Sequence, residues 1–211
     1  MTGCYPELWQ AVLSKSWSHF DNWLNWGRYP AHNFSWNDVQ QFMVKLRQTN
    51  ASDFIEPLLR RQGYSYSLPT EAQWEYACRA GSQTIWPWGN DEDKLGDYAW
   101  YDKNSGEEAP AVRYDPNSHD KTHAVGEKKA NAWGLHDMLG NVWEWVADWD
   151  GPYQSGPVTD PTGPDRGNFR MFRGGSYLDS GRGCRPASRC GGGEASRCGN
   201  IGFRLAFRPG V

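Results

Sequence analysis

The chain has 211 residues and a net charge of −3, and it is rich in aromatic residues, glycine and proline. This length allows one sizeable core, and no linker divides the sequence, so we expect one domain over residues 1–211. The small net charge and the lack of like-charge runs exclude an obvious nucleic-acid partner, and no apolar stretch could span a membrane. With no signal-peptide pattern and an odd count of five cysteines, we expect a reduced compartment rather than a disulfide framework. The location that we expect is the cytoplasm or a virus particle.

Three segments have helical patterns. Residues 6–13 form a short amphipathic pattern, and residues 35–46 form a second one, with Ser35 as the N-cap and apolar residues at three- and four-residue steps. The clearest helix follows Thr70, where Gln73 completes a capping box and Gly81 marks the stop.

The remaining elements are loops and strands. The polar, turn-rich stretch from Trp86 to Asn131 predicts long surface loops with little regular structure. Strand-forming residues concentrate in Val142–Val146, Phe169–Phe172 and Ile201–Phe207, which predict a small antiparallel sheet. Because the helices precede the strands, the sequence indicates an α+β layout with few helices and many long loops.

Three motifs in this order resemble a known family. They are LPTEAQWEYA at residues 68–77, GLHDMLGNVWEW at residues 134–145, and RGGSY at residues 173–177 followed by GFR at residues 202–204. The chain resembles the formylglycine-generating-enzyme, or sulfatase-modifying factor, family over nearly its whole length, and this likeness implies a C-type-lectin-like fold. The opening residues look like the family's start with its usual first strand missing, so homo-oligomerisation stays open.

The enzymes of this family, by the same resemblance, use two active-site cysteines five positions apart that hold copper. Cys184 matches the first of them, counted from the RGGSY motif, but Arg189 stands at the second position and Cys190 comes one residue too late. We therefore expect no catalytic residue and no required cofactor, with Cys184 as a small buried hydrophobe. The alternative is a copper-dependent formylglycine-generating oxidase or a related metal-dependent oxidase.

Residues 178–200 differ in composition from the rest of the chain. They hold six Gly, four Arg, three Ser and three Cys and no aromatic residue, whereas 15% of the whole chain is aromatic. Between the RGGSY and NIGFR motifs, this stretch resembles the variable region of the target-binding proteins of diversity-generating retroelements, in which adenines of asparagine codons are randomised. Changes at the adenines of AAC never yield Lys, Gln, Glu, Met or Trp, and the intervening residues obey this limit except Glu194, which we assign to the framework. A glycine-rich loop of drifting sequence is the simpler alternative, but three cysteines in a surface loop count against it.

Within residues 172–200 the resemblance implies a set of diversified, solvent-facing positions: Phe172, Leu178, Asp179, Ser180, Gly183, Ser188, Cys190, Gly191, Gly192, Gly193, Ser196, Cys198, Gly199 and Asn200. On this interpretation the chain is a non-catalytic ligand-binding protein, in which a rigid framework fixes the backbone while exposed side chains vary. The sequence does not name the target, which we expect to be a protein or a cell-surface ligand. Oligomerisation or attachment to a particle would add avidity.

A structural calcium site is a further expectation from the resemblance. Asp137, Gly140, Val142 and Glu144 match a site of the family, in which two side-chain carboxylates and two backbone carbonyls suit a hard cation. Asp137 and Glu144 would be the side-chain ligands. The alternative is that Asp137 caps a turn and Glu144 pairs with an arginine.

Overall fold

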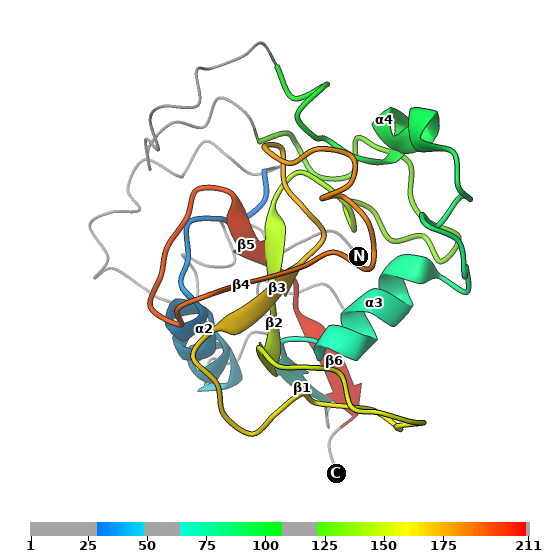
Figure 1. The fold of residues 1–211 in the computed structure, drawn as a ribbon. Helices are drawn as coiled ribbons and strands as arrows, with labels where there is room; N and C mark the ends of the chain where they lie inside the picture. Colours follow the sequence, from blue (N-terminus) through cyan, green and yellow to red (C-terminus); the bar gives the residue numbers. More distant parts are fainter. Residues whose placement is uncertain (1–28, 49–63, 107–121, 210–211) are drawn as a thin grey trace.

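The computed structural model describes residues 29–48, 64–106 and 122–209, and Figure 1 shows their arrangement. The elements in chain order are α2 (Trp36–Gln48), β1 (Tyr64–Ser67), α3 (Glu71–Arg79), a 3-10 turn (Glu92–Lys94), α4 (Leu95–Tyr98), β2 (Trp143–Trp149), β3 (Arg170–Arg173), β4 (Arg189–Gly192), β5 (Ile201–Phe203) and β6 (Ala206–Pro209). The helix predicted over residues 6–13 lies outside the described residues. Within the described ranges, no helix has the length and apolar character needed to cross a membrane.

The central sheet has the strand order β4-β3-β2-β5. β3 pairs antiparallel with both β2 and β4, but β5 runs parallel to β2. The sheet is therefore mixed rather than purely antiparallel as predicted, because a two-residue side-chain period identifies a strand but not its direction. β1 and β6 form a separate antiparallel pair.

Helices α2 and α3 cover opposite faces of the central sheet (Figure 1). Along β2, Trp143 and Trp145 point toward α2 and pack with its apolar residues. Val146 points the other way, into the cluster that contains Trp74 and Cys78 of α3. This alternation is the two-residue period of a strand; β2 thus confirms the strand predicted over Val142–Val146, and the arrangement confirms the α+β class, with one apolar core on each side of the sheet.

Both long helices begin with the side-chain caps that the sequence predicts. At α2, the Ser35 hydroxyl accepts from the Asp38 amide at 3.1 Å, and the Asp38 carboxylate accepts from the Ser35 amide at 2.9 Å. At α3, the Thr70 hydroxyl accepts from the Gln73 amide at 3.2 Å, and the Gln73 side chain accepts from the Thr70 amide at 3.0 Å. The stop of α3 comes one residue earlier than predicted, because Ala80 already takes the left-handed conformation with φ 47°.

Three expectations about the strands need correction. β1 precedes α3, so the strands do not all follow the helices. The strand predicted over Ile201–Phe207 is interrupted at Arg204, because that side chain turns inward and pairs with Glu144. β4 was not predicted at all, since two of its four residues are glycines and the β-propensity of the segment is low.

The region predicted as surface loops, residues 86–131, is anchored to the core in its described parts. Trp86 and Leu95 are buried, and the Trp86 indole donates to the Cys184 carbonyl at 3.1 Å. α4 adds one short turn of helix at Leu95. These contacts hold the loops against the segment that follows β3.

Candidate functional site

Residues 172–200, the predicted variable region, which we call the variable segment, are held by ion pairs between arginines of the segment and carboxylates on α3. The Arg173 side chain is fully buried and donates to Glu71 Oε1 at 2.7 Å, and it also pairs with Glu75. Arg189 binds the same Glu71 carboxylate through Nε at 2.6 Å and Nη2 at 2.7 Å. This geometry is bidentate and partly buried, which makes it among the stronger arrangements of an ion pair. One carboxylate of α3 thus fixes two points of the segment.

The far end of the variable segment is fixed to the start of α2. Arg197 donates to both oxygens of Asp38 at 2.7 Å. The Glu194 carbonyl accepts from the Asn37 amide at 3.0 Å, and the Glu194 carboxylate lies 3.9 Å from Arg170 Nε. Burial raises the pKa of Asp38, but the hydrogen bonds from Arg197 and the helix cap outweigh it, so the pKa of Asp38 is lowered overall. The contacts of Glu194 agree with its assignment to the framework.

The predicted diversified positions fall into three groups by exposure. The exposed ones are Leu178, Ser180, Cys190, Gly191 and Ser196. Those that are half-buried are Asp179, Gly183, Ser188, Gly192, Gly193, Cys198, Gly199 and Asn200. Phe172 is buried, with 6% of its surface exposed.

The prediction that Phe172 faces solvent is wrong. Its ring packs edge-on against Trp143 and Trp145 with centroid distances of 5.3 and 5.1 Å, because β3 directs this side chain toward α2. Gly192 also faces inward, since a Cβ there would lie 3.3 Å from Phe172 and 3.4 Å from Trp145. Cys198 packs partly against the same core. The diversified positions were predicted from the pattern of asparagine codons. That pattern carries no information on side-chain direction, so it could not show that these three positions face the core.

Other half-buried positions take part in local hydrogen bonds. Asp179 Oδ2 accepts from the Ser176 amide at 3.0 Å and from the Ser176 hydroxyl at 2.5 Å. Asn200 donates to the same hydroxyl at 3.2 Å, and the Ser188 hydroxyl donates to the Arg182 carbonyl at 2.9 Å. The positions with the least structural role are therefore the exposed ones.

Cys184 lies in the core rather than at a reactive surface. It is fully buried, its Sγ lies 3.9 Å from the Ser176 carbonyl, and burial raises the pKa of its thiol. Neither Asp179, five positions before it, nor Arg189, five positions after it, is a cysteine. Cys190 is exposed on β4. In the part of the chain that the structure describes, no group of three or more His, Cys, Asp or Glu side chains is arranged to hold a metal.

Glu144, one of the predicted calcium ligands, has two protein partners. Its Oε2 accepts from the Trp74 indole at 2.7 Å, and its Oε1 accepts from Arg204 Nη2 at 2.8 Å. Arg204 Nε also contacts this carboxylate, at 3.0 Å from Oε2. This is the ion pair expected as the alternative role of Glu144.

The environment of Asp137 fits a cation ligand better than that of Glu144 does. Its Oδ2 accepts from the Gly126 amide at 2.7 Å, whereas its Oδ1 is buried and has no hydrogen-bond partner among the described residues. Burial raises the pKa of Asp137. Because buried polar atoms usually have a partner, Oδ1 is the atom of Asp137 that is best placed to bind a cation. Gly140 and Val142 would contribute backbone carbonyls only, and the calcium site stays a prediction.

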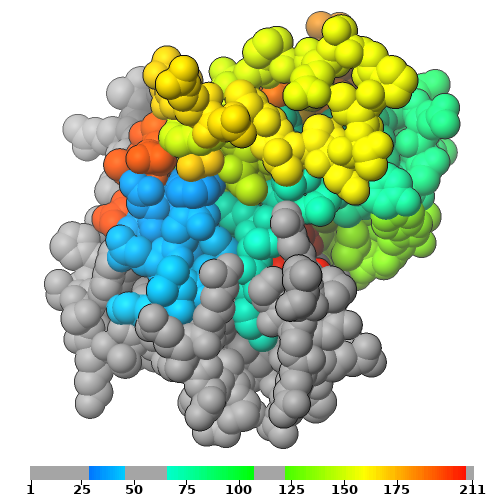
Figure 2. Space-filling model, turned by 90° about the horizontal axis from the view of Figure 1, so that it is seen from below, coloured from blue at the N-terminus to red at the C-terminus, as the bar shows by residue number. Residues whose placement is uncertain are grey.

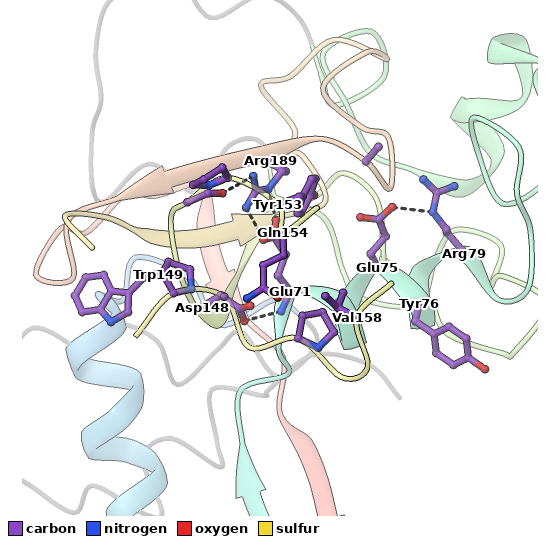
Figure 3. A pocket seen from close by; sticks show the side chains of 17 residues that line it. Glu71, Glu75, Tyr76, Arg79, Asp148, Trp149, Tyr153, Gln154, Val158 and Arg189 are labelled. Atoms are coloured by element: carbon purple, nitrogen blue, oxygen red, sulfur yellow. Dashed lines mark hydrogen bonds and ion pairs between the residues drawn. The ribbon is translucent and has the colours of Figure 1, made fainter. Parts of the chain in front are cut away.

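A groove of about 630 Å³ lies between α3 and the loop after β2. We call it the α3 groove. Figure 3 shows Glu71 and Glu75 on its α3 side and Tyr153, Gln154 and Val158 on its loop side. Figure 2 shows the loop residues after β2, in yellow, beside those of α3, in teal. Sequence patterns did not predict the groove, because its two walls come from segments far apart in the chain.

The fold is similar to that of solved C-type-lectin-like proteins. The structure called Treponema denticola variable protein 1 has a TM-score of 0.77 and 30% sequence identity, and the match covers 98% of this chain and 82% of that one. This likeness confirms the fold that the sequence motifs predict.

The family is shown by sequence as well. A model of the sulfatase-modifying factor enzyme 1-like domain matches residues 4–209, so the chain belongs to this family. It is 39% identical to the formylglycine-generating enzyme of Streptomyces coelicolor over 148 residues, which are 66% of this chain and 46% of the relative. It is 34% identical to the inactive C-alpha-formylglycine-generating enzyme 2 of Mus musculus over 154 residues, which are 68% and 43% of the two chains. The chain spans about half the length of the curated relatives it matches.

Proposed function

We propose that this chain is a non-catalytic binding protein that displays the variable region of a diversity-generating retroelement for target recognition. The observation that carries the proposal is the division of roles within residues 172–200. The framework arginines Arg173, Arg189 and Arg197 reach out of the segment to carboxylates on α3 and α2. None of the exposed diversified positions takes part in these ion pairs. The likeness to Treponema denticola variable protein 1 supports the same interpretation.

The energetics favour a segment that keeps its path while its sequence changes. Exchanging an exposed side chain away from caps and ion pairs usually changes stability by less than about 0.5 kcal/mol. Removing one partner of a buried ion pair costs roughly 3–5 kcal/mol. The fold therefore depends most on Arg173, whose side chain is fully buried, and less on Arg197, whose side chain is 46% exposed, and it tolerates changes between the arginines.

This variant offers a modest contact surface. Of the exposed positions, Leu178 is the large apolar one, with 55% of its surface exposed. The others are small, whereas binding hot spots are enriched in Trp, Tyr and Arg. We expect weak binding by a single copy, which oligomerisation or attachment to a particle would strengthen through avidity.

Sequencing the neighbourhood of the gene tests the diversification. We expect a near-duplicate of the final ~40 codons, with asparagine codons at the diversified positions, together with a gene for a reverse transcriptase. Absence of both would overturn this part of the proposal.

The second candidate function is a copper-dependent oxidase, which the formylglycine-generating enzymes among the relatives favour. Copper binding by a thiol requires its thiolate form, and the raised pKa of buried Cys184 opposes that form. Titration of the reduced protein with Cu(I), with Cys184→Ser as the control, separates the two functions. We expect no stoichiometric site that depends on Cys184, and tight stoichiometric binding that the substitution abolishes would favour the oxidase instead.

A further inference from the structure

The charged groups that line the α3 groove have partners within the protein. Glu71 is bound by Arg173 and Arg189, and Glu75 is bound by Arg173 and by Arg79 at 2.8 Å. Asp148, the remaining charged residue of the lining, is buried and accepts from the amide of Glu71 at 2.7 Å. Both arginines of the lining are paired with carboxylates, and the carboxylate without a cationic partner, Asp148, is buried, so the groove offers little accessible charge and is complementary to an uncharged ligand.

The walls and rim of the groove are apolar and aromatic. Trp149, Val158 and the prolines at 152, 161 and 164 form the loop side. Tyr76 and Tyr153 stand at the rim with 67% and 68% of their surfaces exposed. In residues 29–48, 64–106 and 122–209, no hydrogen bond engages either phenol group, and both side chains are exposed, so both hydroxyls can bind a ligand.

Two neighbouring contacts orient these rings. The Arg189 guanidinium lies 4.3 Å from the centroid of the Tyr153 ring. The Tyr76 ring packs edge-on against Trp133 at 4.9 Å, and Trp133 is itself 48% exposed. The open rim differs from a typical small-molecule site, which encloses most of its ligand. A long ligand that lies along the groove fits this shape better.

We infer that the α3 groove binds an uncharged, proline-rich peptide segment in the polyproline II conformation. Such a segment has three residues per turn and no internal hydrogen bonds, so its carbonyls accept from donors such as the Tyr76 and Tyr153 hydroxyls. Its rings pack on aromatic and apolar walls of the kind that Trp149 and Val158 provide. The preformed helix also loses little entropy on binding.

This site goes beyond the proposed display function and is independent of it. Within residues 172–200, the groove is lined by Ala187 and Arg189, and neither is a predicted diversified position. The groove would therefore be the same in every variant of the protein. A partner held in it would be a constant one, such as an assembly or carrier protein with a proline-rich segment.

Nuclear magnetic resonance titration of the full chain tests the inference, with an acetylated and amidated peptide of about eight prolines as the probe. We expect amide shifts in α3 and residues 149–164, and a dissociation constant below about 1 mM. An uncharged Gly-Ser peptide of the same length should cause none. Absence of shifts with the proline peptide, or equal shifts with both peptides, would overturn the inference.

Three substitutions sharpen the test. Tyr153→Ala and Val158→Asp change exposed side chains, so we expect both variants to stay folded and to bind the proline peptide about tenfold more weakly. Leu178→Ala changes an exposed side chain outside the groove and should bind as the wild type does. Unchanged binding by both groove variants would refute the site. This result would leave the display function standing, because the two groove variants have the same predicted diversified positions as the wild type.

Discussion

The buried ion pair of Arg173 gives the account its most quantitative prediction. The side chain is fully buried, and its two carboxylate partners, Glu71 and Glu75, lie on α3. Arg173→Met keeps much of the side-chain volume but removes the charge, which leaves Glu71 with Arg189 alone. Breaking a buried pair in this way costs roughly 3–5 kcal/mol. For a domain of this size we expect the melting temperature to fall by roughly 6–20 °C.

The assay is thermal unfolding followed by circular dichroism, with Arg182→Met as the matched control. Arg182 lies in the same segment, is exposed and forms no ion pair within the described residues. Its replacement should change the stability by less than about 0.5 kcal/mol. If Arg173→Met melts at the same temperature as the control, the ion pairs do not hold the segment and the argument for a rigid framework fails.

Three further predictions concern single residues. Burial raises the pKa of Asp148, so between the ordinary and the raised pKa the folded state holds a proton that the unfolded chain has lost. Above the raised pKa the buried carboxylate is charged and lowers the stability of the fold. This destabilisation fades as the pH falls through the raised pKa. Asp148→Asn should therefore gain more thermal stability over the wild type at about pH 8 than at about pH 4, and an equal gain at both would contradict the shift. Iodoacetamide should modify Cys190 in the native protein and spare Cys184 until the protein unfolds, as judged by peptide mass mapping; equal rates would contradict the burial of Cys184. Calcium should raise the melting temperature of the wild type but not of Asp137→Asn, and no rise in the wild type would contradict the calcium site and leave Glu144 with its protein partners, Arg204 and Trp74.

The sequence predicted best what local chemistry decides. The capping box at Thr70 and Gln73 lies within four residues, and the structure reproduces both of its hydrogen bonds. The opposite directions of Trp143 and Glu144 follow from the period of a strand, which needs no knowledge of its neighbours. Family motifs carried the fold, because they span nearly the whole chain.

The sequence failed where the answer depends on the path of the chain. The parallel pairing of β5 with β2 results from the route of residues 174–200, which no local pattern encodes. Phe172 was misassigned because only the packing of β3 shows which way it points. The walls of the α3 groove are α3 and the loop after β2, which lie far apart in the sequence, so neither segment alone has a pattern that indicates the groove.

The central claim is that the exposed positions of residues 172–200 can change while the framework cannot. A pair of libraries tests it by soluble expression and thermal unfolding. The first randomises Leu178, Ser180, Cys190 and Ser196, and leaves out Gly191 because a Cβ there would lie 3.3 Å from a backbone carbonyl. The second randomises Arg173, Arg189 and Arg197. The account predicts that most members of the first library melt like the parent and most members of the second do not; collapse of the first library would show that the segment is structural or catalytic and would contradict the display function.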